Sequence, residues 1–180
     1  MSVKIAMEKF FDNMMEGYSK TEEGYPMSSY VDYIDKMIYI GEQDKEGWIR
    51  WKPIKKDKVH DLKDIEEELG IKIHNNIKEY FNSYWFIRIR ASYNSYKISL
   101  DGVQPSDKRY NEFKWKLRGY KNNHEGKLNY IPLGLVNNMD SLVLENETGK
   151  IKVENYEAET YKTIANSLEE LILGLKPAII

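Results

Sequence analysis

Few side chains in this 180-residue sequence have the type and spacing that metal binding or catalysis would need. The three histidines, His60, His74 and His124, are far apart, and none is followed by a second histidine three or four residues later. A zinc site without cysteine would need such pairs, and no H-E-x-x-H motif occurs. The sequence has no cysteine, which excludes disulfides, thiolate metal sites and a cysteine nucleophile. We therefore expect no metal ion and no cofactor.

The motifs of common enzyme classes are missing as well. No G-x-S-x-G segment could form the nucleophile elbow of a hydrolase, and no glycine-rich loop could hold a phosphate group. The acidic run 66–68 does bring carboxylates together, but Glu66 and Glu67 point about 100° apart on a helix and cannot face one substrate bond. We expect these glutamates to form the solvated face of an amphipathic helix, with contact to a partner as the alternative. The chain is predicted not to be an enzyme.

The charge is unevenly distributed along the chain. Residues 1–85 carry a net charge of −4, residues 86–127 a net charge of +6, and residues 140–180 a net charge of −4. The basic block is either one basic face of the folded protein or is neutralised when the chain folds. Its bases alternate with aromatic residues, as on a surface that stacks single-stranded nucleic acid, but the whole chain has a net charge of −2. We expect no nucleic-acid partner.

Two tryptophans stand three residues apart in the segment GWIRWKP, residues 47–53. On a β-strand an odd separation points the two side chains to opposite faces, so only one of them can enter the core. We expect Trp51 to pack inward and to stabilise the sheet by about 2–3 kcal/mol. Trp48 then lies outward or under the N-terminal segment, and an outward Trp48 is a candidate anchor for a partner.

Hydrophobic periodicity predicts helices alternating with short strands. The charged residues of the first helix exclude an apolar leader, and no run of about 18 apolar residues could span a membrane. Helical spacing predicts helices over 3–18, 62–69 (after Asp61 as N-cap), 75–84, 105–117 and 167–175. Alternation predicts strands over 37–40, 48–51, 85–91, 95–100 and 130–136, and a hairpin over 141–153. The fold class is therefore α+β: a single domain, residues 1–180, with a mixed, mostly antiparallel sheet and helices packed around it, on one face.

Four segments in order along the chain resemble one protein family. They are WIRWKP, DIEEELGIKIHNNIKEYF, LENETGKIKV and TIANSLEELILGLKP. Each is a weak motif alone, but their order over nearly the whole chain resembles the Syd family of SecY-interacting proteins. That family belongs to the SUKH superfamily of Smi1/Knr4-like domains.

The resemblance implies a non-catalytic domain that binds another protein. Syd proteins bind the cytoplasmic side of SecY, presenting an acidic concave groove to its basic loops, and so regulate membrane protein insertion and export. Other SUKH relatives are immunity proteins that occlude the active site of a secreted bacterial toxin, which is the alternative. We expect a cytoplasmic protein, peripheral to the inner face of the cell membrane only through its partner. Its oligomeric state stays open.

The resemblance also implies a partner-binding groove, for which the sequence offers two sets of candidate side chains. The acidic candidates, at its rim, are Asp61, Asp64, Glu66, Glu67, Glu68 and Asp101. The aromatic candidates around its mouth are Trp48, Trp51, Tyr84, Trp85 and Tyr96, with core packing as the alternative for each. The basic block 86–127 departs from the acidic family pattern and leaves the sign of the groove's potential open.

Overall fold

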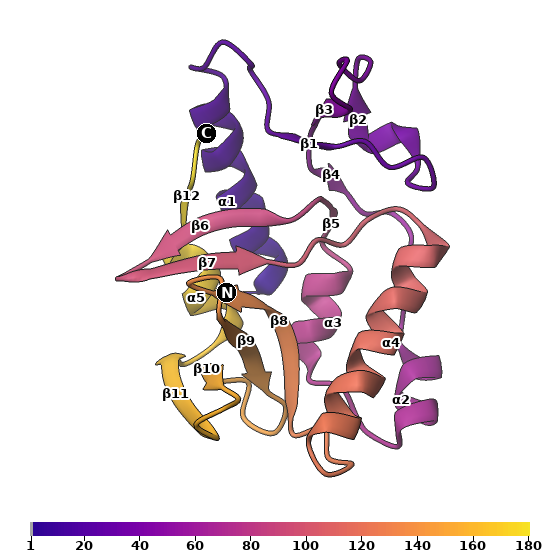
Figure 1. The fold of residues 1–180 in the computed structure, drawn as a ribbon, viewed down its shortest axis with the longest axis vertical. Coiled ribbons are helices and arrows are strands. Elements are labelled where there is room, and N and C mark those ends of the chain that lie inside the picture. The colour runs from indigo at the N-terminus through magenta and orange to yellow at the C-terminus, as the bar shows by residue number, and fades with distance from the viewer. Residues whose placement is uncertain (1) are drawn as a thin grey trace.

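An antiparallel sheet of seven strands is the centre of the computed structural model, which describes residues 2–180 (Figure 1). The strand order is β11-β10-β9-β8-β7-β6-β12, so most strands pair with their neighbours in sequence. The strands are β6 (Ile89–Tyr93), β7 (Tyr96–Leu100), β8 (Tyr130–Val136), β9 (Asp140–Glu145), β10 (Ile151–Asn155), β11 (Thr160–Ala165) and β12 (Lys176–Pro177). The predicted α+β class is confirmed.

Two smaller sheets come from the first half of the chain. One has the order β1-β3-β2, and the other pairs β4 with β5. Their strands are β1 (Met27–Ser29), β2 (Tyr39–Ile40), β3 (Trp48–Trp51), β4 (Ile54–Lys55) and β5 (Tyr84–Trp85). The predicted strand 37–40 forms only in its second half. Its first half belongs to the short 3₁₀ helix η1 (Lys36–Ile38), which Asp35 caps by accepting a hydrogen bond from the backbone nitrogen of Met37.

The α-helices of residues 2–180 are α1 (Val3–Tyr18), α2 (Lys63–Leu69), α3 (Asn75–Phe81), α4 (Asp107–Asn123) and α5 (Leu168–Gly174). The predicted starts of α1 and α5 are confirmed by their caps. The hydroxyl of Ser2 accepts a hydrogen bond from Ile5 N, and that of Ser167 accepts one from Glu170 N. Helix α1 packs against α5 and α3, and its buried stripe is Val3, Ala6, Met7, Phe10, Phe11, Met14 and Tyr18.

Helices cover both faces of the large sheet, which corrects the prediction that they pack on one face. In β10, Val153 faces the main core and Glu154 faces the opposite side. There the end of α4 contacts the sheet: the hydroxyl of Tyr120 donates to Glu154 over 2.6 Å, and a ring nitrogen of His124 contacts the same carboxylate. Val143 of β9 is buried too, although its neighbours along the strand already face the main core. A sheet with both faces buried in this way needs cover on each side.

The predicted strand 85–91 is divided between two sheets. Trp85 ends β5, Ile89 begins β6, and between them the chain passes Gly102 at close range. A Cβ atom at Gly102 would lie 2.5 Å from the carbonyl oxygen of Phe86, so this approach requires glycine. Because four of the five residues 85–89 are apolar, the sequence pattern alone does not reveal where one strand ends and the next begins.

The predicted hairpin 141–153 is confirmed as β9 and β10, and Gly149 in its turn has a φ of +76°. Helix α4, in contrast, runs to Asn123 rather than ending at Leu117. Gly119, two residues beyond the predicted end, lies inside the helix at a position where a Cβ would meet nothing within 4 Å. Strands β1, β4, β11 and β12 were not predicted; all but β11 are two or three residues long, too short for a periodic pattern.

Candidate functional site

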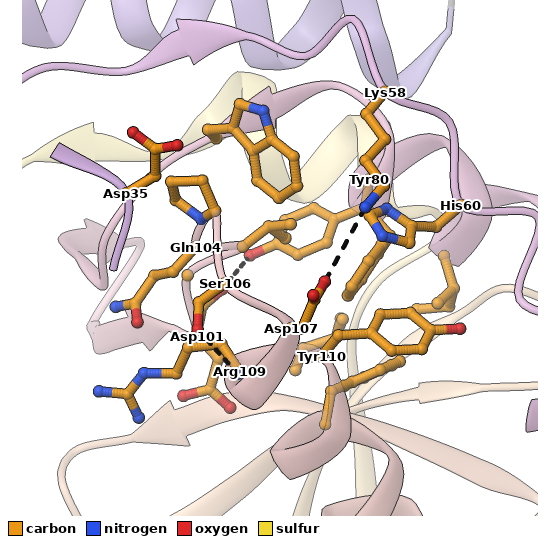
Figure 2. A pocket seen from close by; sticks show the side chains of 18 of the residues that line it. Asp35, Lys58, His60, Tyr80, Asp101, Gln104, Ser106, Asp107, Arg109 and Tyr110 are labelled. Carbon is orange, nitrogen blue, oxygen red and sulfur yellow. Dashed lines mark hydrogen bonds and ion pairs between the residues drawn. The ribbon is translucent and has the colours of Figure 1, made fainter. Parts of the chain in front are cut away.

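A cavity of about 380 Å³ lies where α3, the first half of α4 and the segment 101–106 meet (Figure 2). We call it the α3–α4 pocket. Its floor and walls are mainly apolar and aromatic, formed by Ile77, Tyr80, Phe81, Trp85, Val103, Phe113 and Leu133. This volume lies within the range of about 300–1,000 Å³ that is usual for binding pockets.

Contacts with neighbouring segments of the chain hold the aromatic floor in place. Tyr80 and Phe81 end α3, and the buried hydroxyl of Tyr80 donates a hydrogen bond of 2.7 Å to the carbonyl oxygen of Asp101. Burial raises the pKa of Tyr80 well above its usual value, so this hydroxyl keeps its proton. The ring of Phe81 lies 5.0 Å from the ring of Phe113 on α4. The floor is therefore preformed, and an occupant would not have to order it.

The mouth of the pocket carries exposed carboxylates from three segments of the chain. Asp35 precedes η1, Asp57 lies in the loop between β4 and α2, and Asp107 begins α4. Lys58, which follows Asp57 in sequence, has its Nζ 3.9 Å from Oδ1 of Asp107 (Figure 2). Arg109 also borders the pocket, but its guanidinium pairs with Glu112 at 2.6 Å. The exposed mouth is thus more negative than positive.

Behind Trp85 and Phe81 lies a lysine with no carboxylate partner within the described residues. The Nζ of Lys56 lies 2.7 Å from His60 Nδ1, 2.9 Å from the carbonyl oxygen of Phe81, and over the rings of Phe81 and Trp85 at 4.6 and 4.4 Å. Burial, with a smaller effect of the charge on Lys58, lowers the pKa of Lys56 to about 7. Burial and then the charge of Lys56 lower the pKa of His60 to about 4.

Tyr110 of α4 joins the pocket wall to α2. Its ring stacks on His60 with the centroids 4.8 Å apart, and its hydroxyl donates to Asp64 over 2.5 Å. Burial, followed by the bond to Asp64, raises the pKa of Tyr110. Asp64 also lies 3.1 Å from Lys114, so its carboxylate is engaged within the chain.

Folding neutralises the basic block 86–127 only in part: the carboxylates from outside the block that pair with its lysines and arginines, within the described residues, are Asp64 and Glu68, which lower its net charge from +6 to +4. Lys114 lies between Asp64 and Glu68, at 3.1 and 3.3 Å, and Arg118 also pairs with Glu68. The remaining pairs within the block are Arg88 and Lys116 with Asp101, Arg109 with Glu112, and Lys127 with Glu125. Asp64 and Glu68 of α2 thus pair with Lys114 and Arg118 of α4, and the two helices lie side by side (Figure 1).

The two tryptophans of β3 lie as predicted. Trp51 is 2% exposed and part of the core, whereas Trp48 is 44% exposed on the outer face of the strand. Trp48 does not line the α3–α4 pocket. Its contact with a partner stays a prediction.

Of the other aromatic candidates, only Trp85 lines the α3–α4 pocket. Tyr84 points to the opposite side of β5 and packs on Phe11 of α1, with the ring centroids 4.8 Å apart. It is buried, which corrects its placement at a groove mouth. Tyr96 lies at the start of β7, where Lys162 is 5.7 Å from its ring, and it does not line the pocket.

Among the acidic candidates, only Asp101 borders the pocket, and Arg88 and Lys116 pair with it. Asp61 accepts a hydrogen bond from Lys63 N, but the residue at the helix N-cap is Leu62, with a φ of +60°. Asp64 is bonded to α4 as described above, and Glu67 is exposed without lining the pocket.

Glu66 is not part of a solvated face, which corrects the prediction. Its side chain is only 16% exposed, because its carboxylate contacts residues that follow the C-terminal end of α2. One carboxylate oxygen accepts a hydrogen bond from Ile73 N over 2.8 Å and lies 2.7 Å from Lys78 of α3. These bonds lower the pKa of Glu66 and tie α2 to α3.

The residues of the mouth were missed because no local pattern unites them. Asp35, Asp57 and Asp107 belong to three separate segments with no shared spacing. The segment PSD, residues 105–107, marked a helix start, and it could have shown that Asp107 would be exposed there. Nothing in the sequence placed that helix start beside the other two aspartates.

Two features are absent from residues 2–180. No three side chains from His, Cys, Asp and Glu come close enough together to hold a metal ion. No helix of this part of the chain combines the length and the apolar content needed to cross a membrane.

Comparison with known sequences identifies one protein family. The sequence profile of a family described as "Syd protein (SUKH-2)" matches residues 4–112 of this chain. The match runs from α1 into α4 and includes the aspartates of the pocket mouth.

Three curated relatives are all named Protein Syd. The one from Psychromonas ingrahamii is 22% identical over 95% of this chain and 94% of its own length. The one from Shewanella denitrificans is 22% identical, and the one from Shewanella loihica 24%, each over 99% of this chain and 84% of the relative.

Proposed function

Because this chain belongs to the Syd family, within the SUKH superfamily, we propose that it works by binding another protein and catalyses no reaction. The proposed partner is the cytoplasmic face of SecY, and the proposed role is the regulation of membrane protein insertion and export. The protein would then be cytoplasmic and would reach the membrane only through this partner.

One observation carries the proposal: exposed carboxylates stand beside a preformed aromatic pocket. Asp35, Asp57 and Asp107 form the mouth, and Tyr80, Phe81 and Trp85 belong to the floor. Such a surface complements a basic loop of a partner protein. The carboxylates attract the loop from a distance and the apolar floor retains it after contact.

Attraction of the loop by the carboxylates and its retention by the apolar floor should respond differently to salt. At an ionic strength of about 0.15 M, charges more than about 8 Å apart are largely screened. Steering by the exposed aspartates therefore weakens as salt is added, whereas burial of apolar surface does not. The association rate constant should fall with salt while the dissociation rate constant changes little.

The test is direct binding of the purified chain to SecY in lipid nanodiscs, followed by biolayer interferometry. We expect saturable binding whose association rate constant decreases between 50 and 300 mM sodium chloride, while nanodiscs without SecY bind nothing. Absence of binding to SecY at 50 mM salt would refute the proposed partner. No observation on residues 2–180 favours the alternative of an immunity protein that occludes a toxin.

A further inference from the structure

Exposed apolar side chains lie at the edge of the α3–α4 pocket and beyond it. Met37, in its wall, is 43% exposed, and Val59, between the lining residues Lys58 and His60, is 74% exposed. Large apolar side chains exposed beside a pocket are typical of a surface that another molecule covers. Together with the aspartates, they come from the segments 35–37, 57–60 and 105–107.

Within residues 2–180, part of the negative charge at this mouth is not compensated by a nearby cation. In this part of the chain, Asp107 has only the long contact with Lys58, and the side chain of Asp57 has no ion pair. The carboxylate of Asp35 is occupied by the backbone nitrogen of Met37, which leaves its charge uncompensated. An occupant that adds positive charge just outside an apolar group would complement both features.

We propose that the α3–α4 pocket receives one large apolar side chain of the partner protein, and that Asp57 and Asp107 bind lysine or arginine residues adjacent to it in the partner's sequence. This inference rests on the proposed protein-binding function and specifies the chemistry of the segment that is bound. It predicts a short basic–apolar–basic segment rather than a uniformly basic loop.

A polypeptide fits the site better than a small molecule does. Met37, Asp57 and Asp107 line the cavity at its exposed edge, whereas Val59 beside them does not line it, so a ligand that covers all of these groups must extend beyond the cavity of about 380 Å³. Two polar atoms in the wall, Gln104 Oε1 and Arg109 Nε, are buried without a hydrogen-bond partner. Both residues line the pocket, and one atom is an acceptor and the other a donor, which are the two groups that a peptide unit requires.

The test uses three peptides against the full-length protein labelled with ¹⁵N: acetyl-GKFKG-amide, acetyl-GKAKG-amide and acetyl-GEFEG-amide. Amide chemical shifts report both the site and the dissociation constant at millimolar peptide. We expect GKFKG to shift amides of α3, α4 and the segment 101–106, and to bind at least about tenfold more tightly than GKAKG, because a buried phenylalanine provides that much. GEFEG should bind more weakly than GKFKG by a factor that shrinks as salt is added.

Matched variants of the protein test the acidic part separately. Asp57→Asn together with Asp107→Asn should remove the preference for GKFKG over GEFEG without unfolding the protein, because both side chains are exposed. Glu22→Gln together with Glu157→Gln removes the same charge from exposed positions that do not line the pocket. This control variant should keep the preference for GKFKG over GEFEG.

Three results would overturn the inference: equal affinity for GKFKG and GKAKG, peptide-induced shifts only outside the pocket, or a co-purified small molecule, seen by native mass spectrometry, that the peptide does not displace. Binding to SecY nanodiscs is measured on the same samples. SecY binding without peptide binding in the pocket refutes only this inference, and peptide binding without SecY binding refutes only the proposed partner.

Discussion

Lys58 and Asp107 face each other across the mouth of the α3–α4 pocket, with 3.9 Å between the lysine Nζ and the nearer carboxylate oxygen. Both side chains are mostly exposed, so this ion pair contributes at most about 1 kcal/mol to folding. Its two members can therefore separate at little cost when a basic partner approaches. The acidic mouth is thus available for binding, whereas the carboxylates of Asp64 and Glu68 on α2 are engaged by α4.

Charge reversal at the mouth should slow association with the partner. We expect Asp57→Lys together with Asp107→Lys to reduce the association rate constant with SecY nanodiscs about tenfold at low ionic strength. The free energy of unfolding should stay within about 1 kcal/mol of wild type, because both positions are exposed. Glu22→Lys together with Glu157→Lys is the matched control. An equal loss in the control would mean that net charge, rather than this mouth, governs the rate.

Glu66 and Glu67 are neighbours in sequence but should differ in their effect on stability. Glu66→Lys removes an acceptor for Ile73 N and places a cation next to Lys78, and we expect it to lower the free energy of unfolding by about 1–3 kcal/mol. Glu67→Lys, on the exposed side, should change it by no more than about 0.5 kcal/mol. Urea denaturation of the two variants measures both values. Similar values for the pair would show that the contacts of Glu66 carry no stability.

Substitutions of the two tryptophans of β3 should also differ in their effect on stability. Trp51→Ala opens a cavity in the core and should cost about 3–5 kcal/mol in the free energy of unfolding. Trp48→Ala removes a half-exposed side chain and should cost less than about 1 kcal/mol. Denaturant titration at one protein concentration compares them. Equal losses would contradict the opposite orientation of the two side chains.

Lys56 should make stability depend on pH. Its pKa is about 7 in the folded chain and 10.5 in an unperturbed lysine. Between these values the unfolded chain binds a proton that the folded chain has lost, so the free energy of unfolding should rise as the pH increases from about 7 to about 10. The three acceptors and two rings around the ammonium oppose this shift, and burial outweighs them.

Urea denaturation at pH 7 and pH 9.5 tests this prediction. Wild type should gain more stability over this interval than Lys56→Met, whereas the exposed substitution Lys45→Met should leave the pH dependence of wild type unchanged. An identical pH dependence in wild type and Lys56→Met would show that Lys56 keeps its proton throughout.

Local patterns were enough to predict the parts of the fold that local physics determines. The first helix over 3–18, the hairpin over 141–153 and the start of the last helix at residue 167 each depend on residues within a few positions of one another. The opposite orientation of Trp48 and Trp51 follows from strand geometry alone. The Syd resemblance, based on ordered segments, is confirmed by the family match.

The charges and the candidate site could not be predicted in the same way, because they depend on contacts between distant segments. Glu66 looked solvated because nothing nearby in sequence indicates that Ile73 N and Lys78 approach it. Lys114 and Arg118 of α4 could not be assigned partners from the sequence, because Asp64 and Glu68 lie about 50 residues earlier, on α2. The pocket mouth likewise combines Asp35, Asp57 and Asp107 from three separate segments.

The most direct test of the central claim is site-specific photo-crosslinking in living cells. Benzoylphenylalanine replaces either Met37, exposed in the pocket wall, or Met139, which is 84% exposed and does not line the pocket. We predict a crosslink to SecY from position 37 and none from position 139. A crosslink to SecY from position 139 alone, or none from position 37 in cells where the chain still co-purifies with SecY, would contradict binding through this surface.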